Sequence, residues 1–202
     1  MTPQEKVVLI EAKHKNQIRA FGKHMLEIMK SRRNLDHCAE KAIQIVNEMT
    51  AIVAPYSPCK KGCGYCCYQN IVISSWEAKR IAKFSLRKMN AVIGHEFPTY
   101  DTQEELSELA NKFMGHPCPF LKKDACSIYE IRPFMCRLHV SLDNDNFNCN
   151  IIGIPNAIVP YFDFELTKAA IAVLFTRRGD SFADIREFFR DEDAQTKTRE
   201  IG

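Results

Sequence analysis

Apolar side chains recur at three- and four-residue steps over the first fifty positions, which is the spacing of one face of an α-helix. One largely apolar stripe runs from Val7 to Ile28 and a second from Leu35 to Val53, with a polar break at residues 31–34. The sequence TPQE at positions 2–5 supplies a threonine cap, a proline in the first turn and the glutamate of a capping box. These features predict two helices that pack as an antiparallel hairpin and end at Pro55.

Capping signals predict further helices downstream. The sequence SSWE at 74–77 predicts a helix to about Met89, and TQEE at 102–105 predicts one that ends near Lys112. A helix is also predicted over 164–177, where Gly179 follows in the position of a C-terminal cap. The sequence SFAD at 181–184 predicts a last short helix to about Arg190.

The middle of the chain is predicted to be irregular. Three prolines between residues 116 and 150 limit helix length, so only short turns are expected near 127–131 and after Pro133. Beyond residues 71–73 the sequence shows no convincing β pattern, so the predicted fold class is all-α, with a helical hairpin and further short helices around an irregular cysteine-rich centre. We expect one compact domain with these parts: a hairpin at 1–54, a cysteine-cluster region at 55–150, C-terminal helices packed on it at 151–190, and a frayed tail at 191–202.

The compartment decides how the nine cysteines are interpreted. The sequence has no apolar run of the roughly 18 residues that a membrane span needs, and its first residues lack the apolar core of a signal peptide. We therefore expect a cytoplasmic protein with no membrane partner. Disulfides are rare in that reducing compartment, so nine cysteines in 202 residues raise the question of metal binding.

The net charge of +3 conceals an uneven distribution. Residues 1–90 carry 16 Lys and Arg against 7 Asp and Glu, whereas residues 91–202 carry 12 against 18. The basic residues are spread along the predicted hairpin without interleaved aromatic side chains, which does not favour a nucleic acid partner. A solvated helix face is the simpler explanation, and docking to an acidic protein partner is the alternative.

Eight of the cysteines fall into two groups. The first is a C-x3-C-x2-C-C run in a loop with two glycines, and the second is spread over the irregular middle of the chain. Thiolates are ligands that zinc and iron prefer, and such short spacings let one loop present several sulfurs to one centre. The candidate metal ligands are Cys59, Cys63, Cys66, Cys67, Cys118, Cys126, Cys136 and Cys149. Cys38 lies beside the second apolar stripe and is better explained as a small buried hydrophobe.

Three further features bear on the predicted centre. Neighbouring side chains diverge, so Cys66 and Cys67 are awkward ligands for a single ion and fit two centres, or different metals of one cluster. His139 could replace a cysteine, although a hydrogen-bonded or exposed histidine is the more common role. Arg132 and Arg137 are candidate cofactor-binding residues that could donate to thiolates or sulfides, or could equally be structural.

The chain resembles a known family at these positions. The run Cys59-x3-Cys63-x2-Cys66-Cys67, followed by CPFL at 118–121 and by C-x2-YE-x-RP-x2-CR at 126–137, is similar to the CxxCxxCC cysteine-cluster family of bacterial proteins. The resemblance covers roughly residues 59–149 and implies a zinc- or iron-chelating domain that binds metal through these cysteines. The three residues between Cys59 and Cys63 depart from the two in the family name.

The spacing also fits the three-cysteine motif of radical S-adenosylmethionine enzymes. That motif follows the first strand of a βα barrel, and no βα series is predicted here. All-cysteine ligation and nearby aromatic side chains favour an iron–sulfur cluster, whereas eight cysteines also make two zinc sites. The first hypothesis is therefore an iron–sulfur protein with a redox or electron-transfer role, and the alternative is a zinc-binding interaction module. No catalytic set is recognisable, so the sequence leaves open whether the protein is an enzyme.

Overall fold

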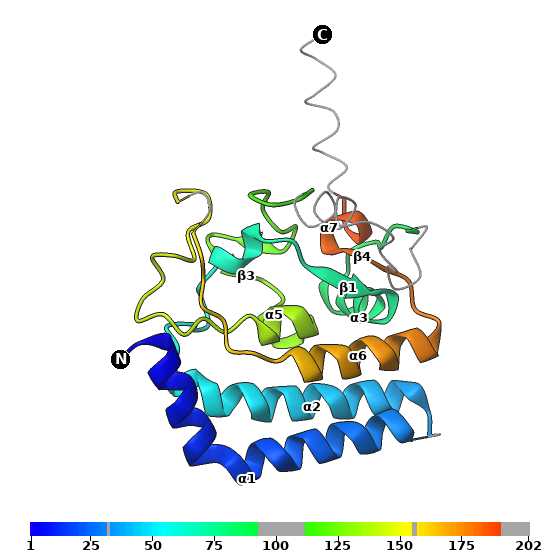
Figure 1. Ribbon diagram of the computed structural model, residues 1–202. Helices are drawn as coiled ribbons and strands as arrows, with labels where there is room; N and C mark the ends of the chain where they lie inside the picture. The colour runs from blue at the N-terminus through cyan, green and yellow to red at the C-terminus, as the bar shows by residue number, and fades with distance from the viewer. Residues whose placement is uncertain (32, 93–111, 155–156, 191–202) are drawn as a thin grey trace.

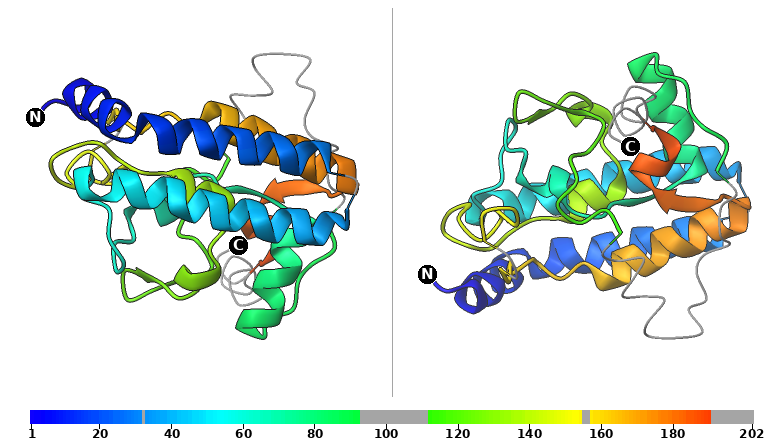
Figure 2. Two further views of the ribbon diagram at one scale, coloured as in Figure 1. Left: turned by 90° about the horizontal axis from the view of Figure 1, so that it is seen from below. Right: turned by 90° about the horizontal axis from the view of Figure 1, so that it is seen from above.

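The computed structural model describes residues 1–31, 33–92, 112–154 and 157–190. Helices α1 (Pro3–Lys30), α2 (Leu35–Val53) and α6 (Glu165–Arg178) lie side by side and all contact one another. The cysteine-rich segments lie on one side of this helical layer (Figures 1 and 2). No helix in the described part of the chain is both long enough and apolar enough to cross a membrane.

The predicted helical hairpin is confirmed, and its ends follow from the caps. The Thr2 hydroxyl accepts a hydrogen bond from the Glu5 backbone N–H at 3.2 Å, and the Glu5 carboxylate accepts one from the Thr2 N–H at 2.8 Å. Helix α1 bends at His14, whose backbone is not helical (φ −114°, ψ 15°). The predicted C-terminal helix is also confirmed, because α6 ends at Gly179 in the left-handed conformation (φ 70°).

Two apolar clusters support the cysteine region. The larger fills the space between the three long helices and α5 (Phe134–Leu138), with Val46, Leu138 and Phe175 almost fully buried. The other contains Ile73 of β1 (Val72–Ser74), Ile81 of α3 (Ser75–Ser85) and Phe120. Apolar packing therefore holds the irregular segments from both sides.

The prediction of an all-α fold needs correction, because the protein is mostly helical with two small antiparallel sheets. Strand β1 pairs with β4 (Phe182–Asp184), so that Ile73 faces Ala183 in the register. Strand β2 (Leu121–Lys122) pairs with β3 (Ala125–Cys126) across a tight turn. Lys123 and Asp124 in this turn have φ of 48° and 59°, as a two-residue hairpin turn requires. Strands of two or three residues are too short to show a period-two pattern. In addition, β1 and β4 lie about 110 positions apart in the sequence, so no local signal predicts that they pair.

The prediction that residues 181–184 begin the last helix was wrong, again because so short a strand leaves no periodic signal in the sequence. Residues 182–184 form β4, and the last helix, α7 (Ile185–Phe188), begins only after Asp184, whose side chain caps it. Helix α3 ends at Ser85, earlier than predicted, where Leu86 is left-handed (φ 57°). The turns predicted around 127–131 and after Pro133 are present as η3 (Tyr129–Ile131) and α5, while the helix predicted at 102–112 and the tail at 191–202 fall mainly or wholly outside the described residues.

Candidate metal centre

All eight candidate cysteines line one cavity of about 450 Å³. The first group comes from the loop after η1 (Ala54–Tyr56) and from η2 (Tyr65–Tyr68), and the second from β3, α5 and the segments on either side of them. Cys38 is absent from this cavity and is buried in the helical core, at 3% exposure. The fold therefore separates the eight cysteines from the ninth as the spacing predicted.

Cys67 is the centre of an inner group of thiols. Interaction with the side chains of Cys118, Cys126 and Cys66 raises the pKa of the Cys67 thiol. The same interactions lower the pKa of Cys66 and of Cys118, and bring the pKa of Cys126 down to about 7. Cys66 and Cys67 thus interact with each other inside the 3₁₀ turn of η2, so side-chain divergence does not assign them to separate centres.

Cys136 lies next to this inner group. Burial raises the pKa of its thiol well above the usual value, and the charges of Cys66, Cys118 and Cys126 raise it further. Desolvation and neighbouring thiolates both oppose a free thiolate at this position, and a bound cation would offset both effects. The inner group therefore comprises five cysteines.

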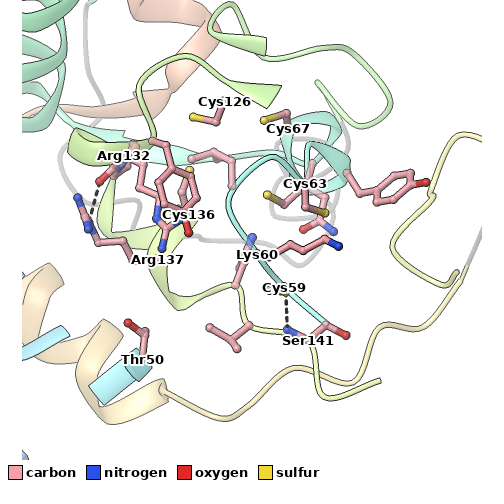
Figure 3. A pocket seen from close by; sticks show the side chains of 18 of the residues that line it. Thr50, Cys59, Lys60, Cys63, Cys67, Cys126, Arg132, Cys136, Arg137 and Ser141 are labelled. Carbon is pink, nitrogen blue, oxygen red and sulfur yellow. Dashed lines mark hydrogen bonds between the residues drawn. The ribbon is translucent and has the colours of Figure 1, made fainter. Parts of the chain in front are cut away.

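The remaining cysteines, Cys59, Cys63 and Cys149, form an outer group on the other side of the cavity. Ser141 joins two of them, because its backbone N–H donates to the Cys59 sulfur at 3.4 Å and its side chain hydrogen-bonds with Cys149. Figure 3 shows Cys59 beside Ser141, opposite Cys67 and Cys126, with Cys63 between them. Burial raises the pKa of Cys63 and raises that of Cys149 to about 11.

The two cysteine segments meet closely at Gly64. A Cβ atom at this position would lie 2.4 Å from the carbonyl oxygen of Asp124, in the turn between β2 and β3. Gly62 in the same loop has a φ of 93°, which side chains strongly disfavour. Both glycines are therefore required for the loop to lie against the hairpin that carries Cys126.

The two candidate arginines have different surroundings. Arg137 uses its guanidinium within the protein: Nε donates to the carbonyl of Arg132, Nη1 to Asn47 Oδ1 and Nη2 to the carbonyl of Glu130, at 2.7–2.9 Å. Arg132 lies over the Tyr129 ring at 3.8 Å, and its buried Nε has no hydrogen-bond partner. The pKa of Cys126 is lowered mainly by Cys67, and the charge of Arg132 lowers it by a smaller amount. Arg132 thus keeps a buried donor without a hydrogen-bond partner, while Arg137 uses its donors on residues 47, 130 and 132.

His139 lines the same cavity and stacks on Tyr161, with ring centroids 5.1 Å apart. Its Nδ1 is buried without a hydrogen-bond partner. Burial, and to a lesser extent Lys168, lowers the pKa of His139 to about 4, so the imidazole is neutral at physiological pH. A neutral imidazole can act as a metal ligand.

The cavity brings together thiols from both cysteine segments. Among the described residues, no group of three or more His, Cys, Asp or Glu side chains stands ready to hold a metal ion. The donor set itself, eight thiols in one partly buried cavity, fits zinc or iron.

The fold and this cavity define a mostly helical protein built around a cysteine cluster. Residues 58–151 match the family model CxxCxxCC, described as "Putative zinc- or iron-chelating domain". The matched segment includes all eight cysteines of the cavity and ends before α6. Neither the curated proteins nor the solved structures yielded a match to the chain.

Two residues that support the outer group were missed from the sequence. The Lys6 ammonium, on a side chain that is 7% exposed, donates to the carbonyls of Leu142 and Asp143, each at 2.7 Å. Lys6 therefore connects α1 to the loop that carries Ser141 and Cys149. In the sequence it is one of many lysines in a basic helix, and Ser141 belongs to a polar loop, so no local signal distinguishes either residue.

Proposed function

We propose that the protein binds an iron–sulfur cluster through the cysteines of this cavity and has a redox or electron-transfer role. The observation that carries the proposal is that eight cysteines line one cavity, in which three thiols interact with Cys67 and with the nearby Cys136. A structural zinc ion also takes four such ligands, so the cysteine count alone does not separate the two metals. Iron–sulfur clusters are held by cysteine thiolates and supply one-electron redox chemistry when bound.

The charge near the inner group agrees with this proposal. A cluster held by thiolates is anionic, and donors near its sulfurs offset that charge and tune the potential. Arg132 has its buried Nε free of protein partners and lies near Cys66 and Cys126. We assign Arg132 the role of a donor to cluster sulfur and assign Arg137 the role of holding the backbone of residues 130–132.

The test is the absorption spectrum of protein purified without oxygen, together with iron, sulfide and zinc analysis. An iron–sulfur protein should be brown, contain iron and acid-labile sulfide, and bleach reversibly on reduction. Cys126→Ser should lose the colour, whereas Cys38→Ala should keep it because Cys38 lies in the helical core. A colourless protein with stoichiometric zinc would contradict the iron–sulfur proposal, and a protein that binds neither metal would contradict metal binding altogether.

A zinc-binding interaction module is the second candidate, favoured by exposed basic side chains along α1. Lys13, Lys15, Arg19 and Lys23 are all exposed, and such side chains are available to an acidic protein partner. In this case zinc would hold the irregular segments together, and a chelator should lower the unfolding temperature. Reversing the charges at Lys13, Lys15 and Arg19 should abolish low-salt binding to polyglutamate, used as an acidic probe, without changing zinc content.

A further inference from the structure

The C-terminal segment 182–189 contacts the inner cysteine group although it lies outside the matched domain. Asp184 and Arg186 are each only 7% exposed, and they form an ion pair with Nη1–Oδ1 and Nη1–Oδ2 distances of 2.9 and 3.2 Å. The Asp184 carboxylate also accepts from the backbone N–H of Ile71 at 2.7 Å. The pair is thus fixed between β4, α7 and the segment that follows Cys67.

The rest of the Arg186 guanidinium is directed at backbone carbonyls of both cysteine segments. Nη2 donates to the carbonyls of Cys67 and Gln69, at 3.0 and 3.2 Å. It also donates to the carbonyl of His116 at 2.5 Å, and Nε donates to that of Pro117 at 3.3 Å. One side chain therefore binds the carbonyl of one inner cysteine and the two carbonyls that precede the other, Cys118.

These contacts require an arginine. Only a planar guanidinium presents its N–H groups as a rigid fork that can reach two backbone segments and a carboxylate together. A lysine would keep the charge but could satisfy at most three acceptors, from a single nitrogen. Because Cys67 and Cys118 also share a backbone hydrogen bond of 2.7 Å, the guanidinium braces the junction where their thiols meet.

We propose that Arg186, oriented by Asp184, is a positioning residue of the metal centre, so that the centre extends beyond the cysteine domain to the C-terminal β4–α7 segment. The inference rests on the proposed metal binding and holds for either metal. Groups that orient metal ligands without touching the metal typically contribute 10- to 100-fold in metal affinity. A residue that only stabilised the fold would not alter the geometry of the bound metal.

The experiment uses Co²⁺ as a probe on the full-length, reduced, metal-free chain, since the absorption of Co²⁺ depends on its ligand geometry. Wild type is compared with Arg186→Lys, Asp184→Asn and the control Arg190→Lys, which changes an exposed arginine of the same segment. We expect Arg186→Lys to bind Co²⁺ at least roughly 10-fold more weakly, with shifted absorption bands. Asp184→Asn should change in the same direction, and Arg190→Lys should match wild type. Circular dichroism and thermal unfolding of the metal-free proteins measure the fold separately.

Wild-type Co²⁺ affinity and bands in a folded Arg186→Lys would overturn the inference, even if its metal-free form were less stable. Should both Arg186→Lys and Asp184→Asn fail to fold, hydrogen exchange of wild type decides the question. Co²⁺ should then slow exchange at 182–189 as well as at the cysteine loops, and protection confined to 58–151 would overturn the inference. A wild type that takes up neither Co²⁺ nor iron and sulfide contradicts the proposed function itself, and the inference with it.

Discussion

The backbone N–H of Cys118 donates a hydrogen bond of 2.7 Å to the carbonyl oxygen of Cys67. This bond joins the first cysteine cluster of the sequence, at 59–67, to the second, at 118–149. The thiols of the same two residues also interact. The backbone therefore joins the loop of Cys67 directly to the segment of Cys118. Loops that are joined in this way lose less conformational entropy when their thiols hold one metal centre.

The position of Cys67 leads to the first prediction. Cys67→Ser should lose most of the bound metal, because the Cys67 thiol is the one that contacts three other inner thiols. Elemental analysis of the purified protein measures the effect. Cys38→Ala is the matched control, since Cys38 lies 3% exposed in the helical core. It should keep its metal while losing about 1 kcal/mol of stability, and equal metal content in both variants would contradict the role of Cys67.

The helices could be predicted because their signals are local. A capping box at residues 2–5 and Gly179 after α6 fix helix ends through bonds within a few residues, and both are present in the structure. The candidate cysteines were chosen by spacing and composition, and the fold brings all eight to one cavity while Cys38 stays apart.

Long-range partners could not be predicted. The pairing of β1 with β4 and the contacts of Arg186 with the carbonyls of Cys67 and Pro117 join positions far apart in the chain. A three-residue strand shows no usable periodicity, and an arginine in a short C-terminal helix resembles any solvated arginine. For the same reason the sequence does not distinguish a structural from a cofactor-binding role for Arg132 and Arg137. Only the fold shows which guanidinium has its donors occupied.

The second prediction concerns acid stability and His139. Burial lowers its pKa from 6.5 to about 4, so the unfolded chain binds more protons than the folded one between these values. Folding stability should therefore fall as the pH drops from 6.5 toward 4, by at most roughly 1.4 kcal/mol per pH unit. Denaturant unfolding of metal-free wild type and His139→Gln at several pH values measures the difference. Between pH 4 and 6.5, the free energy of unfolding should rise with pH more steeply for wild type than for His139→Gln. Parallel pH dependences of the two proteins would show that His139 is not buried in its neutral form.

The third prediction follows from the buried Lys6. Lys6→Met leaves the carbonyls of Leu142 and Asp143 without their donor, and an unsatisfied buried carbonyl costs about 1–3 kcal/mol. Urea unfolding should show a loss of this size. Lys13→Met, which changes an exposed lysine of the same helix, should stay within about 0.5 kcal/mol of wild type. Equal stability of the two variants would mean that α1 does not hold this loop.

The last prediction separates the two contacts of Ser141. Ser141→Ala removes the hydroxyl that hydrogen-bonds with Cys149 but keeps the backbone N–H that donates to Cys59. Burial already raises the pKa of Cys149 to about 11, and the Ser141 hydroxyl opposes that rise. Removing the hydroxyl should raise the pKa further and slow alkylation of Cys149, because the thiolate is the reactive form. Mass spectrometry of the metal-free protein treated with iodoacetamide resolves each cysteine, and Cys59 serves as the internal control. Faster alkylation of Cys149, or equal slowing at both sites, would show that the hydroxyl acts through loop packing instead of through the sulfur.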